Sequence, residues 1–145
     1  MNTPIHLVPN SKESDWKKHK NGGGWVYSSA FVGDNAYVGP YAAVYGNAEV
    51  TGNATIDDYA RVYDNAKVTQ DAMVFGHAKV FGNAFIYGNA KVFGYSKVYG
   101  NAEVYGEAIV FDNAELLGSV KVGGYSTIYG NDRFTSGVKI IKNNS

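Results

Sequence analysis

The feature that most constrains this chain is a six-residue phrase, in outline x-Val-Tyr-Gly-Asn-Ala, repeated from Trp25 to Asp132 without insertion or deletion. The stretch holds 18 hexads. The second residue of every hexad is aliphatic, and 17 of these 18 residues are β-branched. β-branched side chains favour strands because their restricted χ1 packs well on a pleated surface. The period therefore predicts short strands that point this residue inward.

The other fixed positions of the hexad predict tight turns between the strands. The sixth residue is Ala in 14 of the 18 hexads, the exceptions being Ser96, Val120, Ser126 and Asp132. The fourth is mostly Gly and the fifth is mostly Asn or Tyr, a combination that favours a turn with positive φ. One such coil cannot bury its apolar face alone, so we expect successive coils to stack around one shared core.

Phrases such as Val80-Phe81-Gly82-Asn83-Ala84 and Val98-Tyr99-Gly100-Asn101-Ala102 resemble the hexapeptide-repeat superfamily, in particular its small uncharacterised bacterial and phage members. The resemblance covers about three quarters of the chain. It implies an all-β fold, a left-handed triangular parallel β-helix in which three hexads form one coil. The 18 hexads then give about six coils.

The repeat also suggests how the chain is divided. We expect residues 1–24 to be an N-terminal cap, 25–138 the β-helix and 139–145 a C-terminal tail. Residues 133–138 form a degraded nineteenth hexad, which places Ile140 in the next aliphatic slot and leaves the tail to cover the last edge.

An uncovered coil edge would expose unpaired backbone groups, so the N-terminal segment is expected to cover the first coil. Its apolar side chains, Ile5, Leu7, Val8 and Trp16, are predicted to lie over the open end of the core. Residues 14–19 are predicted to form one helical turn.

Composition excludes several classes of protein and site. The 13 basic and 13 acidic residues give a net charge of zero, which makes a nucleic-acid partner unexpected. The absence of cysteine excludes disulfides and thiolate metal sites. No apolar segment has the length of a signal-peptide core or of a membrane span, so we expect no membrane partner and a cytoplasmic protein.

Residues 18 apart should stack on one side of the solenoid, and this spacing predicts three outward aromatic columns. The first is Tyr27, Tyr45, Tyr63, Phe81 and Tyr99; the second is Phe75, Phe93, Phe111 and Tyr129; a corner column holds Tyr41, Tyr59, His77 and Tyr95. Stacking of one ring on the next is sufficient to explain such columns. Exposed apolar strips also mark partner sites, and Tyr is favoured at interface hot spots. The two interpretations are compatible, and these columns are the predicted binding residues.

Two polar columns are predicted to be structural. The Asn column, Asn47, Asn65, Asn83 and Asn101, suits the turn conformation. The basic column Arg61, Lys79 and Lys97 is predicted to be a solvated face in preference to a phosphate site.

The resemblance also suggests one form of catalysis. Many members of the superfamily are acyltransferases that use acetyl-CoA or acyl carrier proteins, with a histidine near a subunit interface. His77 is the one histidine inside the repeat, and it is a weak candidate for a general base. The zinc carbonic anhydrases of the superfamily need three histidine ligands, which the repeat lacks. We expect no metal and no cofactor, with CoA implied only by the acyltransferase alternative.

The preferred hypothesis is a non-catalytic solenoid that acts by protein contact through its aromatic columns. It would either self-assemble, as a trimer by resemblance, or serve as a small accessory or inhibitor protein of the kind that phages and mobile elements encode. The alternatives are an acyltransferase that uses His77 and a carbohydrate-binding module that uses the tyrosine columns.

Overall fold

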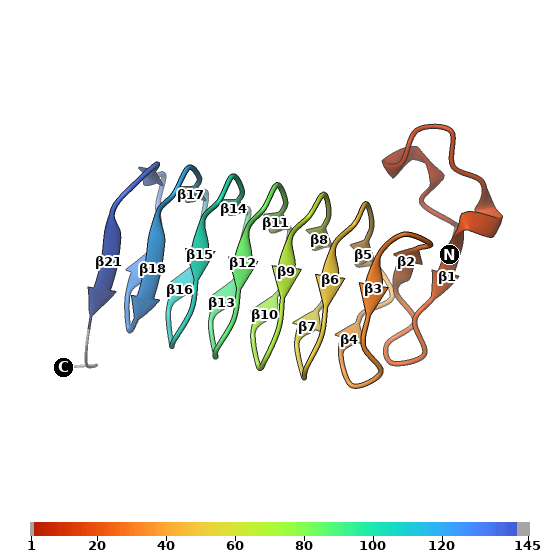
Figure 1. The fold of residues 1–145 in the computed structure, drawn as a ribbon, viewed down its shortest axis with the longest axis horizontal. Coiled ribbons are helices and arrows are strands. Elements are labelled where there is room, and N and C mark those ends of the chain that lie inside the picture. The colour runs from red at the N-terminus through yellow and green to blue at the C-terminus, as the bar shows by residue number, and fades with distance from the viewer. Residues whose placement is uncertain (1, 142–145) are drawn as a thin grey trace.

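The computed structural model describes residues 2–141 and is an all-β parallel solenoid of about six turns (Figure 1). This confirms the predicted class of fold. Each coil contributes one strand to each of three sheets, and strands three apart in the chain are hydrogen-bonded neighbours. Two short 3₁₀ helices, η1 (Ile5–Leu7) and η2 (Glu13–Asp15), precede the strands.

Sheet A contains β1 (Trp16–Lys18), β2 (Trp25–Tyr27), β5 (Ala43–Val44), β8 (Arg61–Val62), β11 (Lys79–Val80), β14 (Lys97–Val98), β17 (Glu115–Leu116) and β20 (Arg133–Phe134). Sheet B contains β3 (Phe31–Val32), β6 (Glu49–Val50), β9 (Lys67–Val68), β12 (Phe85–Ile86), β15 (Glu103–Val104), β18 (Lys121–Gly124) and β21 (Val138–Ile141). Sheet C contains β4 (Tyr37–Val38), β7 (Thr55–Ile56), β10 (Met73–Val74), β13 (Lys91–Val92), β16 (Ile109–Val110) and β19 (Thr127–Ile128).

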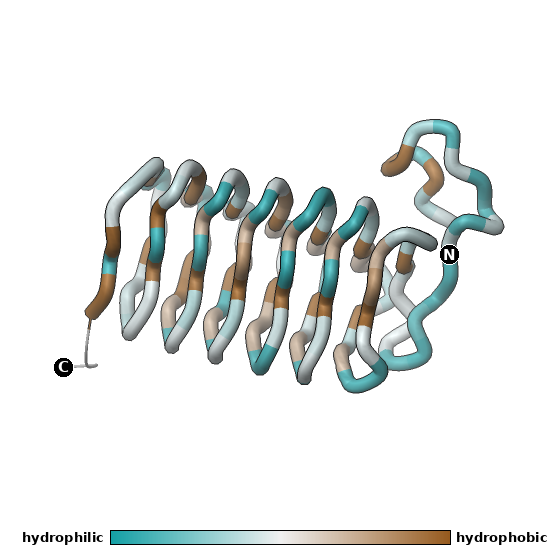
Figure 2. Tube along the Cα trace, viewed as in Figure 1, coloured by the Kyte–Doolittle hydropathy of each residue, from teal (hydrophilic) through white to brown (hydrophobic). Residues whose placement is uncertain are grey.

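The register is the one that the repeat predicts. Val62, Val80 and Val98 are direct partners on neighbouring strands, 18 residues apart, and all three are fully buried. The alanines of the sixth position, from Ala36 to Ala114, are buried beside them in one continuous core. Figure 2 shows the result as hydrophobic segments that recur at the same places in successive coils.

Two serines replace alanine in the sixth column and remain buried, which the hydrophobic pattern alone does not explain. The Ser96 hydroxyl donates to the carbonyl oxygen of Phe93 at 2.8 Å, and the Ser126 hydroxyl donates to that of Lys139 at 3.1 Å. Since each hydroxyl finds an acceptor, its burial leaves no unpaired polar group.

The N-terminal segment covers the solenoid differently from the prediction. Trp16 does not lie over the end of the core; it packs against the outer side of sheet A, on Tyr27 and Tyr45, in a second cluster separate from the core. Of residues 14–19, only Ser14 and Asp15 are helical, in the 3₁₀ turn η2, because Trp16–Lys18 is strand β1, which pairs antiparallel with β2. The backbone hydrogen bonds between β1 and β2 therefore decide the structure of this segment, and the side-chain pattern that suggested a helical turn does not.

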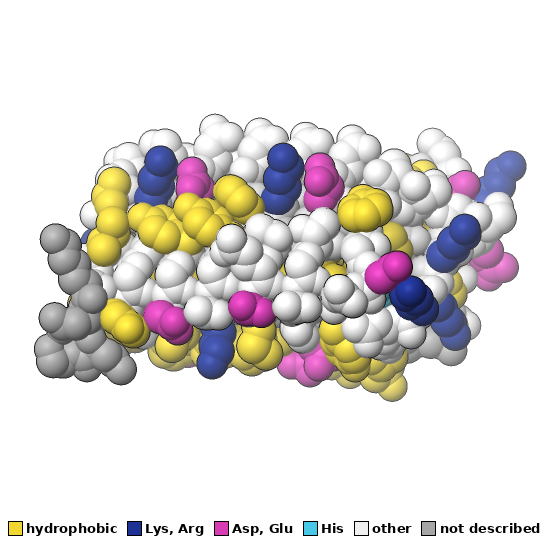
Figure 3. Space-filling model, turned by 60° about the horizontal axis from the view of Figure 1, so that its bottom comes forward, with side chains coloured by type: hydrophobic (Ala, Val, Ile, Leu, Met, Phe, Trp, Pro, Cys, Tyr) yellow, Lys and Arg dark blue, Asp and Glu magenta, His cyan; other side chains and the backbone are white. Residues whose placement is uncertain are grey.

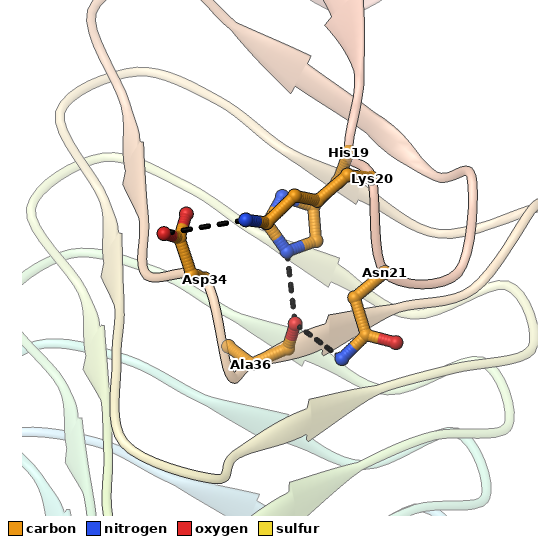
Figure 4. A network of polar contacts seen from close by, with 5 residues as sticks. All are labelled: His19, Lys20, Asn21, Asp34 and Ala36. Carbon is orange, nitrogen blue, oxygen red and sulfur yellow. Dashed lines mark hydrogen bonds and ion pairs between the residues drawn. The ribbon is translucent and has the colours of Figure 1, made fainter.

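The loop after β1 covers part of the first coil edge. The backbone N–H of Gly24 donates to the carbonyl oxygen of Val38 at 2.8 Å, and that of Val38 donates to Asn21 at 3.0 Å. The carbonyl oxygen of Ala36 accepts from His19 Nε2 at 2.8 Å and from Asn21 Nδ2 at 3.1 Å, while Lys20 forms an ion pair with Asp34 (Figure 4). These bonds occupy the edge of β4.

At the other end, the chain leaves the repeat register by one residue. β21 pairs with β18 so that Lys139 lies opposite Val122 and Ile140 opposite Gly123. The prediction that Ile140 fills the aliphatic slot is therefore wrong, because the interval after β20 is one residue short of a hexad. Lys139 takes that slot, and its Nζ lies 4.1 Å from the Phe134 ring centroid. The rest of the predicted tail, 142–145, lies outside the described residues.

Candidate interaction surfaces

The most apolar outward surface lies on sheet C. We call it the sheet C patch, and it consists of Met73, Phe75, Phe93, Ile109, Phe111 and Tyr129. The rings follow directly after strands β10, β13, β16 and β19, and their stacked centroids are 4.7, 5.3 and 5.8 Å apart. Residues two apart on a strand point to the same side, so Met73 and Ile109 share this surface. Lys91, between them in register, is the one charged side chain on these four strands.

The side chains of the sheet C patch are held in place but are not covered. Phe75, Phe93 and Phe111 are half-buried, since each ring covers the faces of its neighbours and leaves its edge outward. Tyr129, at the C-terminal end of the column, is exposed. The stacking that the sequence predicts is therefore present, and a strip of aromatic edges remains accessible.

The N-terminal part of the sheet A column is occupied by contacts with the cap. Tyr45 is only 8% exposed because Trp16 and the cap residues Leu7 and Val8 pack around it. Burial raises the pKa of the Tyr45 and Tyr63 phenols above the ordinary value for tyrosine. Farther along, Phe81 stacks on Tyr63 at 4.9 Å and on Tyr99 at 4.7 Å, and the Tyr99 hydroxyl donates to Glu115 at 3.0 Å.

Sheet B carries one stacked aromatic pair, and the charged side chains around it are of both signs. Tyr87 and Tyr105 stack at 5.2 Å, and the Tyr87 hydroxyl donates to Glu103 at 3.1 Å. Burial, reinforced by this hydrogen bond, raises the pKa of Tyr87 to about 12. Figure 3 shows basic and acidic side chains sharing one row along a side of the molecule, next to a hydrophobic strip.

The corner column is the most exposed of the three predicted columns. Tyr41, Tyr59, His77 and Tyr95 stack in order with centroids 5.4, 5.0 and 4.8 Å apart. Both ring faces of His77 are covered, by Tyr59 and by Tyr95. Within residues 2–141, no hydrogen bond or ion pair joins His77 to a carboxylate that would orient it as a base.

The remaining histidines lie apart from His77. His6 is exposed in η1, and His19 belongs to the loop that covers the first coil. In the described part of the chain no group of three His, Asp or Glu side chains has the arrangement of a metal site. The described helices include none that is long and apolar enough to cross a membrane.

Comparison of the chain with protein-family models, with curated proteins and with solved structures found no match. The repeat and the stacked parallel coils that it forms establish the fold, and the function depends on the surfaces that this fold presents.

Sequence spacing located the three predicted columns but did not show which of their residues the cap covers. In the structure the cap covers the N-terminal part of the sheet A column, Tyr27, Tyr45 and Tyr63, and leaves Phe81, Tyr99, the sheet C patch and the corner column uncovered. The signal for the cap was Trp16, a large apolar residue outside the repeat, but its position gives no indication of which surface it covers.

Proposed function

We propose that this chain is a member of the hexapeptide-repeat superfamily, with left-handed triangular coils, and that it is a non-catalytic solenoid that self-assembles through the sheet C patch. The observation that supports the proposal is the contiguous strip of half-buried aromatic edges on strands that carry a single charge, Lys91. Apolar strips of this kind on a folded surface mark protein contact sites.

The regular spacing of the rings in the sheet C patch favours a second copy of the same chain as the partner. The rings of the sheet C patch recur once per coil, at nearly constant spacing. Another copy presents the same spacing over the same length, so its side chains can interlock with the strip over several coils. A cyclic trimer is the assembly that the resemblance suggests.

The acyltransferase alternative has less support from the geometry. A general base needs a free nitrogen within hydrogen-bond reach of its substrate and usually a group that orients the ring. Among residues 2–141 no hydrogen-bonding group orients the His77 ring, which is held instead by stacking on Tyr59 and Tyr95 at interplanar angles of 7° and 3°.

The test is the mass of the protein in solution, measured by light scattering after size exclusion. The wild type is expected to be a multiple of 15.7 kDa, and the double variant Phe93→Ser/Phe111→Ser is expected to be a monomer. Tyr87→Ser/Tyr105→Ser is the matched control, because it removes a stacked pair from sheet B and should leave the assembly unchanged. A monomeric wild type, or equal dissociation of both variants, would overturn the proposal.

A further inference from the structure

A groove of about 610 Å³ runs along the corner between sheets C and A, outside the sheet C patch. Its lining is Tyr59, Arg61, His77, Lys79, Tyr95, Lys97 and Asn113. One wall is the exposed corner stack and the other is a row of three cationic side chains. No acidic residue lines it.

The three cations are in direct register, and Arg61 is the one of them that also interacts with the phenol of Tyr45. Arg61, Lys79 and Lys97 are paired on neighbouring parallel strands, one strand spacing apart. None forms an ion pair among residues 2–141. The next residue in the column, Glu115, accepts from the Tyr99 hydroxyl and pairs with Arg133 at 3.9 Å. Asp58 and Asp64 accept from backbone N–H groups of Gly76 and Gly82.

On sheet B, the same strand position holds pairs of opposite charge. There Glu49 lies opposite Lys67, and Glu103 lies opposite Lys121 with an ion pair at 3.7 Å. Like charges directly opposite on neighbouring strands are destabilising. Three in succession on sheet A are therefore unfavourable to the isolated fold, and an anion in the groove would remove that repulsion.

The corner stack ends inside the groove. Tyr95 covers His77 on one side, but the next residue of its column is Asn113, which has no ring. Tyr95 is 62% exposed, so one face of its ring is open beside Lys97. The groove thus combines a row of cations, a free aromatic face and a side-chain amide.

We infer that this groove binds a linear acidic glycan, a chain of sugar rings with a carboxylate or sulfate on successive units. The length of a pyranose unit is close to one strand spacing, so the row of cations spans about three sugars, and the anionic groups on the side of the glycan that faces the groove would meet it. The apolar face of a terminal sugar would cover the open face of Tyr95, and its hydroxyls would bond to Asn113.

The geometry favours a glycan over a single-stranded nucleic acid. Proteins bind single strands by stacking bases on free aromatic faces. Here the ring centroids of Tyr59, His77 and Tyr95 are 5.0 and 4.8 Å apart, which leaves no room for a base between them, so this stack offers successive bases only the one open face of Tyr95. A sugar chain can lie along the ring edges without separating the stack.

The experiment is calorimetric titration of the full chain with oligogalacturonate, a carboxylated glycan. Saturable binding is expected, with no binding of a neutral cello-oligosaccharide. Lys79→Gln should weaken binding by about ten-fold or more. Lys67→Gln is the matched control, since it removes one positive charge at the same strand position on sheet B and should leave binding unchanged. Tyr95→Ala should also weaken binding.

Sulfated heparin oligosaccharides, oligothymidylate and polyglutamate complete the comparison. Tighter binding of heparin than of oligogalacturonate would identify the anion as sulfate and keep the inference. Absence of binding to both glycans would overturn it, as would equal loss in Lys67→Gln. Equal or tighter binding of oligothymidylate or polyglutamate would overturn it too, because the groove would then bind any polyanion or a different polymer. Circular dichroism of each variant confirms that it is folded.

Discussion

Gly82 shows at the scale of a single residue why the fourth position of the hexad is so restricted. Its φ is +63°, and a Cβ atom there would lie 2.8 Å from the backbone nitrogen of Gly100 in the next coil. The turn therefore requires both a left-handed conformation and the absence of a side chain. Gly130 has a similar φ of +65°, but a Cβ atom would meet nothing within 4 Å.

Because the two glycines have similar φ but differ in the space available to a Cβ atom, Gly82→Ala and Gly130→Ala form a matched pair of variants. In both turns the backbone N–H of the glycine donates to an aspartate of the preceding coil at 3.0 Å, so this bond is common to the two. Gly130→Ala should cost about 1–2 kcal/mol of unfolding free energy, the penalty for an L-residue in the left-handed region. Gly82→Ala should cost clearly more, because the backbone of the next coil must also move. Denaturant unfolding measures both; equal costs would contradict the described contact between coils.

Some residues of this turn carry a role that the sequence analysis missed. Asp58, Asp64 and Asp112 stand where glycine is usual, and each accepts from the backbone N–H of the glycine 18 residues later. The signal was present, since in each case the aspartate is followed by glycine at that spacing. The aliphatic and alanine columns were predictable because their burial depends only on the period.

At the scale of one element, β1 determines which part of the sheet A column is covered. Trp16 is 4% exposed, stacks edge-on against Tyr27 at 5.2 Å and donates from Nε1 to the Ser11 hydroxyl at 3.2 Å. No periodicity extends into residues 1–24, so the pairing of β1 with β2 depends on tertiary contacts that the sequence pattern does not show. The register change at β21 also lies outside the repeat pattern, because the interval between β20 and β21 is one residue shorter than a hexad.

Trp16→Ala should therefore release the cap and leave the solenoid folded. Loss of a buried tryptophan costs about 3 kcal/mol or more. If the cap opens and closes quickly relative to cleavage, this cost corresponds to roughly 100-fold faster tryptic cleavage near Lys17 and Lys18. The exposed Glu13→Ala is the control and should cleave like the wild type. Unchanged cleavage of Trp16→Ala would show that the cap does not depend on this side chain.

At the scale of the whole molecule, each coil is stabilised by the coils on either side of it. The core is one continuous cluster from Ala36 to Ile128, so damage in a middle coil removes a neighbour from both halves. Stability in such arrays is a sum of coil and interface contributions. The uninterrupted repeat made this organisation predictable, but it does not show which outward residues the cap covers.

Val80→Asp should unfold the protein, because it places a charge at a fully buried position in the central coils. Val138→Asp is the control, since Val138 is exposed on the last strand and should tolerate the change. Circular dichroism and thermal melting report the outcome. A folded Val80→Asp variant would mean that the inward register is wrong.

Self-assembly through the sheet C patch is the central claim, and the absence of cysteine in the chain allows a direct test. Lys91→Cys, Lys67→Cys and Lys97→Cys each place one thiol at the same strand position on sheets C, B and A, and all three sites are exposed. Treatment with a short bis-maleimide at micromolar protein should give covalent dimers from Lys91→Cys and almost none from the other two. Equal yields from all three variants, or no dimer from Lys91→Cys, would contradict the claim.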